Sequence, residues 1–163
     1  MYTLVGFILL ILLSIVVIIM GRYRRKTIEG SLYNVYINLL ELYGYYFWMV
    51  SFPKYINDPE ILDKVKKLTN IIADDVRKIR RLSIAQSIAE FLSKQEHNPS
   101  VNYNTCRNIL QEMGVTLQKK YPNIAGRLRE TIPPKTAGED ADCLADILNP
   151  ASLIDWKPSH KRH

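Results

Sequence analysis

The side chains able to do metal or nucleophilic chemistry are few and widely spaced. Cys106 and Cys143 stand 37 residues apart, and the three histidines are His97, His160 and His163. A structural zinc site needs four close ligands, usually in paired spacing, so the pattern predicts no metal. Two cysteines also make no disulfide framework, and we expect both to be small, partly buried residues in a reducing compartment.

An acidic cluster near the C-terminus is the remaining candidate for catalysis, with Glu139, Asp140, Asp142 and Asp146. It adjoins a Pro/Gly-containing linker, and acids at the start of a helix are stabilised by the helix dipole without any catalytic role. The chain has no glycine-rich phosphate loop, no HExxH, no CxxC and no G-x-S-x-G. The sequence therefore predicts a protein that is not an enzyme and needs no cofactor.

The charges of this 163-residue chain, which sum to +6, are unevenly placed. Residues 1–21 contain no Asp, Glu, Lys or Arg, and Ser14 is the one polar side chain within residues 4–20. A bilayer core of about 30 Å needs roughly 20 helical residues, so residues 1–21 predict a transmembrane anchor. The anchor positions that we single out are Leu4, Phe7, Leu10, Ile15 and Ile19.

A cleaved signal peptide is the alternative for this segment. Signal peptides have a basic start, an apolar core of about 7–15 residues and a small-residue cleavage site. Here no Lys or Arg precedes the apolar run, the run is longer, and Met20-Gly21-Arg22-Tyr23 is a poor cleavage site. The pattern favours an uncleaved anchor.

Four basic residues follow the apolar run directly: Arg22, Arg24, Arg25 and Lys26. Basic flanks stay in the cytoplasm, so we expect a single-pass protein with its N-terminus outside and the C-terminal domain inside. Juxtamembrane cations also attract anionic lipid. The simpler interpretation gives these residues a role in topology alone.

Residues 31–52 form a second apolar stretch with one charge, Glu41, and eight of the sixteen aromatic residues. Three interpretations compete: a second span, which the polar residues make costly, an amphipathic helix lying near the bilayer, or the first helix of the domain core. We favour the last two together, with Tyr45 on the polar face and Val50 on the apolar face. The candidate partner contacts in this stretch are Tyr36, Tyr43, Tyr45, Phe47 and Trp48.

A helical domain is expected over residues 53–132. Asp58-Pro59 predicts a helix start, and an apolar stripe continues to Leu92 with a possible break near Leu82, where residues 83–86 fit a capping box. Further helices are expected over residues 104–120 and 124–131. Residues 133–163 predict a linker, a short helix over 140–148 and a tail. With residues 1–21 as anchor and 22–52 as basic and aromatic segment, the predicted class is all-α, a transmembrane helix followed by a small helical domain.

A second basic group lies late in the long stripe: Arg77, Lys78, Arg80 and Arg81. It could bind anionic lipid, nucleic acid or an acidic partner, although cations near a helix C-terminus need no ligand to explain them. A dedicated nucleic-acid protein would carry more charge, with aromatic residues among the basic ones.

The sequence thus favours a membrane-anchored scaffold or assembly factor that contacts another protein at the cytoplasmic face. Two alternatives share the pattern. One is a viral envelope or virion-assembly membrane protein. The other is a peripheral reader of anionic lipid or nucleic acid that uses the two basic groups.

Overall fold

The computed structural model describes residues 2–95 and 97–131, with side chains described from Leu10 onward. Its elements are α1 (Tyr2–Ser51), a short 3-10 helix η1 (Pro53–Tyr55), α2 (Pro59–Lys78), α3 (Ser83–Ser93), α4 (Pro99–Lys120) and α5 (Pro122–Thr131). Over these residues every regular element is a helix and no strand occurs, which confirms the all-α class. The linker, short helix and tail expected over 133–163, with Cys143, His160 and His163, lie outside the described residues.

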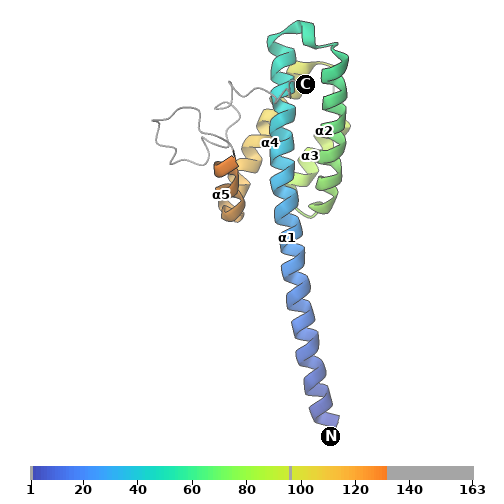
Figure 1. Ribbon diagram of the computed structural model, residues 1–163, viewed down its shortest axis with the longest axis vertical. Helices are drawn as coiled ribbons and strands as arrows, with labels where there is room; N and C mark the ends of the chain where they lie inside the picture. Colours follow the sequence, from blue (N-terminus) through green and yellow to red (C-terminus); the bar gives the residue numbers. More distant parts are fainter. Residues whose placement is uncertain (1, 96, 132–163) are drawn as a thin grey trace, which may run out of the picture.

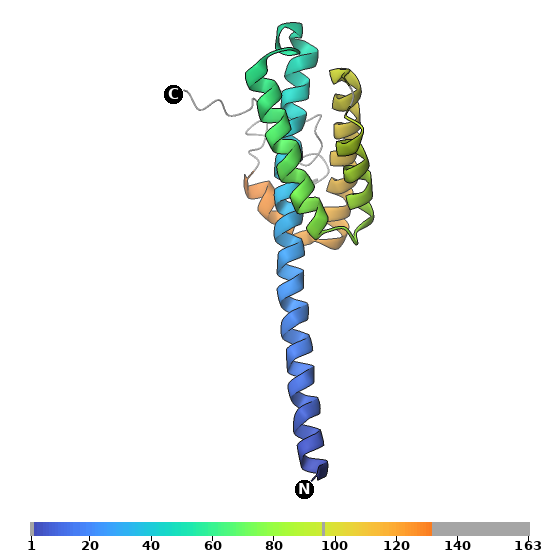
Figure 2. The same ribbon diagram turned by 90° about the vertical axis from the view of Figure 1, so that its right-hand side faces the viewer.

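The second half of α1 and the helices α2, α3 and α4 form an up-down-up-down four-helix bundle. Each helix packs against the next along the chain, and contacts between α1 and α4 close the ring. Figures 1 and 2 show the first half of α1 projecting alone from one end of this bundle. Helix α5 turns back beside α4 and also contacts α1. We call the end from which α1 projects the proximal end, and the opposite end, at η1, the distal end.

Two helices begin in the same way, with a polar cap followed by proline. The Asp58 carboxylate accepts hydrogen bonds from the backbone N–H groups of Glu60 and Ile61 at 2.9 and 3.2 Å. The Asn98 side chain accepts one from the N–H of Ser100 at 3.0 Å. Both caps satisfy N–H groups that have no partner inside the helix. Helix α4 therefore begins at Pro99, earlier than the predicted start at residue 104.

The predicted break near Leu82 is present, but the predicted capping box is not. Leu82 is the N-cap of α3 with an extended backbone, Ser83 is already helical, and no side chain caps this end. The turn over residues 79–82 reverses the chain, so that Ile84 and Ile88 pack back into the core formed with α2 and α4. Reversal buries the far half of the apolar stripe, which a single long helix would leave in solvent.

The aromatic stretch of α1 forms the centre of the core. Helices α2, α4 and α5 surround it, so its buried surface is wider than one amphipathic face. The expected assignment of Tyr45 to a polar face and Val50 to an apolar face is wrong, because Tyr45 is 2% exposed and Val50 is 41% exposed. The hydrophobic side chains of α1 that the bundle buries are Leu32, Val35, Tyr36, Leu39, Leu40, Leu42, Tyr43, Tyr45, Tyr46 and Met49.

Contacts between aromatic rings and hydroxyl groups join α1 to its neighbours. The rings of Tyr43 and Tyr103 stack with centroids 4.9 Å apart, and their hydroxyls are hydrogen-bonded at 2.8 Å. On the other side, Tyr33 is hydrogen-bonded to Thr131 at 2.7 Å, and the Arg127 guanidinium lies 4.5 Å from the Tyr33 ring centroid. These contacts attach α4 and α5 to the same helix.

The first half of α1 has a different environment. The helix runs without a break from Tyr2 to Ser51, although the sequence predicted separate elements on either side of residue 21. The large apolar side chains of residues 10–20 are 46–67% exposed. Within the residues available for this test, no helix combines the length and apolar character needed to cross a membrane, so the predicted transmembrane helix is not confirmed.

Glu41 offers a test of the packing between α1 and α2. Burial raises the pKa of its carboxyl group, opposed by attraction to Lys64 of α2 and by a hydrogen bond with Tyr45. A carboxyl whose pKa is higher in the folded state opposes folding once it ionises, so its cost appears as the pH rises through the carboxyl range. We expect Glu41→Gln to increase the free energy of unfolding near pH 7 and to change it little near pH 3.

Urea unfolding of the full chain in detergent at both pH values measures this difference. Glu112→Gln, at an exposed position on α4, is the matched control. An equal change in both variants, or no pH dependence for Glu41→Gln, would contradict the assignment.

Candidate functional site

The two basic groups of the sequence lie at the same end of the bundle. Arg24 and Ile28 of α1 line a cleft together with residues 77–82, which end α2 and form the following turn. The cleft has a volume of about 270 Å³. We call it the arginine cleft. We call the residues of these two groups, which are eight of the basic residues at this end, the basic collar: Arg22, Arg24, Arg25, Lys26, Arg77, Lys78, Arg80 and Arg81.

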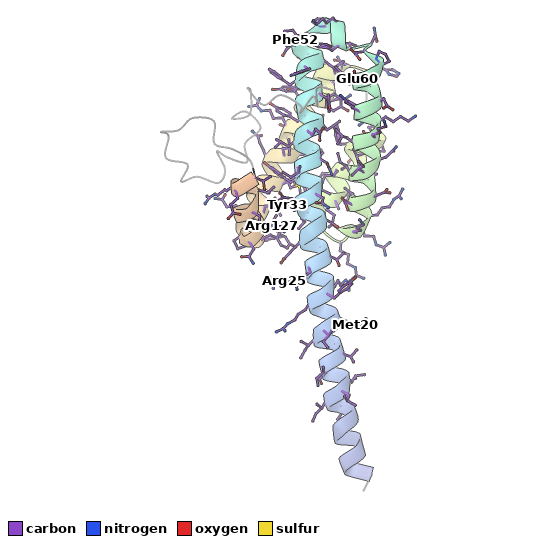
Figure 3. The ribbon with its side chains drawn as sticks, in the orientation of Figure 1. Met20, Arg25, Tyr33, Phe52, Glu60 and Arg127 are labelled. Carbon is purple, nitrogen blue, oxygen red and sulfur yellow. The ribbon has the colours of Figure 1, made fainter. Side chains whose placement is uncertain are left out.

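The antiparallel packing of α1 and α2 brings the two basic groups to the same end of the bundle. Helix α2 runs back along α1 from the distal end and finishes where α1 leaves the bundle (Figure 1). Ile79 is buried in the core and holds the turn against the bundle, while Arg80 and Arg81 on the same turn are exposed. In Figure 3, Arg25 and Met20 lie on the projecting part of α1, below the bundle.

Three cations of the collar have carboxylate partners. Arg25 pairs with Glu29 at 3.0 Å, Arg77 with Asp74 at 3.0 Å, and Lys78 with Asp75 at 2.7 Å. The hydrogen bond to Asp75 raises the pKa of the Lys78 ammonium group. Arg77 and Lys78 also lie in the last turn of α2, where the helix dipole favours cations. Local structure is therefore sufficient to explain these two residues.

The other five cations have no such explanation. Among the described residues, no carboxylate pairs with Arg22, Arg24, Lys26, Arg80 or Arg81. Arg80 and Arg81 also lie beyond the last turn of α2. Three of these unpaired cations, Arg24, Arg80 and Arg81, line the arginine cleft. The proximal end therefore presents a concentrated positive potential suited to an anionic ligand or surface.

Comparisons with models of protein families, with curated proteins and with solved structures find no match. Within residues 2–95 and 97–131, no three metal-ligating side chains come together. Cys106 is fully buried on α4, its thiol donates to the Leu39 carbonyl at 3.5 Å, and burial raises the pKa of the thiol.

The aromatic residues predicted to contact a partner are divided by the fold. Tyr36, Tyr43 and Tyr45 lie in the core, so a partner could reach their side chains only by opening the bundle. Phe47 and Trp48 are half-buried. Partner contact through these two residues stays a prediction.

The distal end carries an apolar surface that the sequence did not predict. Val50, Phe52 and Leu62 are 41–50% exposed there, and Phe52 packs edge-on against Tyr55 with centroids 6.1 Å apart. The stacked pair of Trp48 and Tyr55, with centroids 5.6 Å apart, adjoins them. Pro53 was the available signal, because it starts η1 and so ends α1 at this surface, between Val50 and Phe52. We call Val50, Phe52 and Leu62 the distal apolar surface.

The exposed arginines of the turn are expected to contribute little to stability. The double substitution Arg80→Gln with Arg81→Gln removes two cations that have no carboxylate partner in the described structure, so we expect the free energy of unfolding to change by less than about 0.5 kcal/mol. Ile79→Ala removes a buried side chain on the same turn and is expected to cost about 2–5 kcal/mol. Denaturant unfolding of the full chain in detergent measures both, and a large loss in the arginine variant would give these residues a structural role.

Proposed function

We propose that the protein is a membrane-anchored helical scaffold. In this proposal residues 1–21 cross the bilayer once, and the bundle lies on the cytoplasmic face and contacts another protein there. One observation carries the proposal: the exposed apolar part of α1 continues, within one unbroken helix, into the part of the basic collar that lies on α1, residues 22–26.

The exposed apolar side chains support insertion into lipid. Residues 10–20 expose a continuous apolar helix surface, and the apolar sequence extends back to Leu4. Water-exposed apolar surface is unfavourable by about 25 cal/mol per Å². A helix also satisfies its backbone hydrogen bonds internally, as a lipid environment demands.

The position of the collar supports the cytoplasmic orientation. Arg22, Arg24, Arg25 and Lys26 follow the apolar run, and the fold adds Arg80 and Arg81 from the α2–α3 turn at the same end. Cations beside a span favour the cytoplasmic side, where the membrane surface is anionic. Because the collar directly adjoins the apolar helix, its position favours lipid over nucleic acid as the anionic surface.

The continuous helix α1 supports a role in holding the distal apolar surface at a fixed distance from the bilayer. At 1.5 Å per residue, α1 separates residue 21 from Ser51 by about 45 Å. The distal apolar surface would then face away from the bilayer, where Phe52 and Leu62 remain accessible to another protein. This arrangement fits a scaffold better than a protein that acts only on lipid.

The anchor is tested by placing charge in the apolar run. Leu12→Arg with Val16→Arg adds two cations on one helix face, at about 2.5–3.5 kcal/mol each at a bilayer centre. We expect the full chain to remain in membranes during alkaline carbonate extraction and this variant to be released. Val50→Arg with Phe52→Arg adds the same charge at exposed distal positions and is expected to stay in the membrane. Release of the unmodified chain would contradict the anchor.

Orientation is tested separately with cysteines at either end of α1. Thr3→Cys and Lys54→Cys are each made in a Cys143→Ser background, where the buried Cys106 is shielded from reagent. We expect a membrane-impermeant thiol reagent to label Thr3→Cys from outside intact cells and Lys54→Cys only after permeabilisation. Labelling of Lys54→Cys from outside would reverse the compartment of the bundle.

A further inference from the structure

We infer that the arginine cleft binds a phosphomonoester carried by a lipid headgroup. The inference rests on the proposed membrane anchor, because it requires that the collar faces lipid. It goes further by assigning one cleft and one chemical class of ligand, whereas general electrostatic attraction would use every cation of the collar alike.

The cations of the cleft match a phosphate with more than one negative charge. Asp74 and Asp75 balance Arg77 and Lys78, which leaves Arg24, Arg80 and Arg81 as the unbalanced charges. Guanidinium groups form paired hydrogen bonds to phosphate oxygens. Three such groups around one cleft suit a phosphomonoester, whose charge approaches −2, better than a phosphodiester with a single charge.

The size and walls of the cleft fit a small headgroup. Its volume of about 270 Å³ lies below the usual range for drug-sized ligands, which is about 300–1,000 Å³. Ile28 and Leu82, both half-buried, add apolar surface beside the arginines. No aromatic residue lines the cleft, so it lacks the stacking surface with which proteins bind single-stranded nucleic acid.

The distance of the cleft from the apolar run favours a lipid phosphate over free phosphate as the ligand. Arg24 and Ile28 follow residue 21 by three and seven positions, which places them about 5–10 Å beyond the apolar run. The headgroup layer on each side of a bilayer is about 5–8 Å thick. If the apolar run spans the bilayer core, the cleft therefore lies at the depth of the lipid phosphates.

The test compares two lipids whose headgroups carry a phosphomonoester in one case and a phosphodiester in the other. Full-length protein in nonionic detergent is titrated with phosphatidic acid, a phosphomonoester, or with phosphatidylglycerol, a phosphodiester, of the same acyl chains, and bound lipid is counted by native mass spectrometry. We expect phosphatidic acid to bind at least about tenfold more tightly. The triple variant Arg24→Gln, Arg80→Gln, Arg81→Gln should lose this preference, with affinity for phosphatidic acid falling about 100-fold, or about fivefold per cation.

A matched variant separates the cleft from net charge. Arg22→Gln, Lys119→Gln, Lys120→Gln removes three exposed cations outside the cleft, and it should keep the preference for phosphatidic acid. Equal losses in both triple variants, or no preference in the unmodified protein, would overturn the inference. Circular dichroism confirms that both variants are folded.

Two competitors distinguish the source of the phosphate. Displacement of phosphatidic acid by millimolar inorganic phosphate would assign the cleft to free phosphate, and displacement by a single-stranded oligonucleotide at lower concentration would assign it to nucleic acid. Either result would overturn the lipid assignment. Carbonate extraction reports on the anchor independently, so a protein that stays in the membrane but binds both lipids equally would lose this inference and retain the proposed function.

Discussion

The burial of the second half of α1 is the interaction on which the rest of the structure depends. Helices α2, α4 and α5 all pack against this segment, and its aromatic residues provide much of the buried surface. A helix covered on several sides needs apolar residues around most of its circumference. The density of Tyr and Leu in residues 31–49 meets this need, and the hydroxyls of Tyr43 and Tyr33 are hydrogen-bonded to Tyr103 and Thr131.

The continuity of α1 connects this core to the exposed apolar segment. With no break at residue 21 or residue 30, the direction of the projecting helix is set by the packing of the bundle. The basic collar then occupies a definite position at the proximal end, and the distal apolar surface occupies the opposite end. The two ends differ in chemistry because one carries unpaired cations and the other exposes apolar side chains around Phe52.

Packing also separates residues that are similar in sequence. Arg77 and Arg80 belong to one basic run, yet Arg77 has a carboxylate partner within α2 while Arg80, beyond the helix end, has none within the described structure. Tyr45 and Phe52 belong to one aromatic run, yet Tyr45 is in the core and Phe52 is exposed. Composition therefore identified the runs but could not divide them between stability and surface.

Patterns within a few residues were sufficient for the all-α class, the start of α2 at Asp58-Pro59 and the break near Leu82. Each depends on local backbone and side-chain interactions, such as the two hydrogen bonds to Asp58. Asn98-Pro99 is the same kind of helix start, a polar cap followed by proline, and it marks the start of α4. The predicted start at residue 104 did not use it. Local patterns could not predict how exposed each tyrosine is. They also could not predict that Arg24 lines the same cleft as Arg80 and Arg81. Both depend on which helices cover α1 and on where α2 ends along it, and contacts between residues distant in the chain determine those positions.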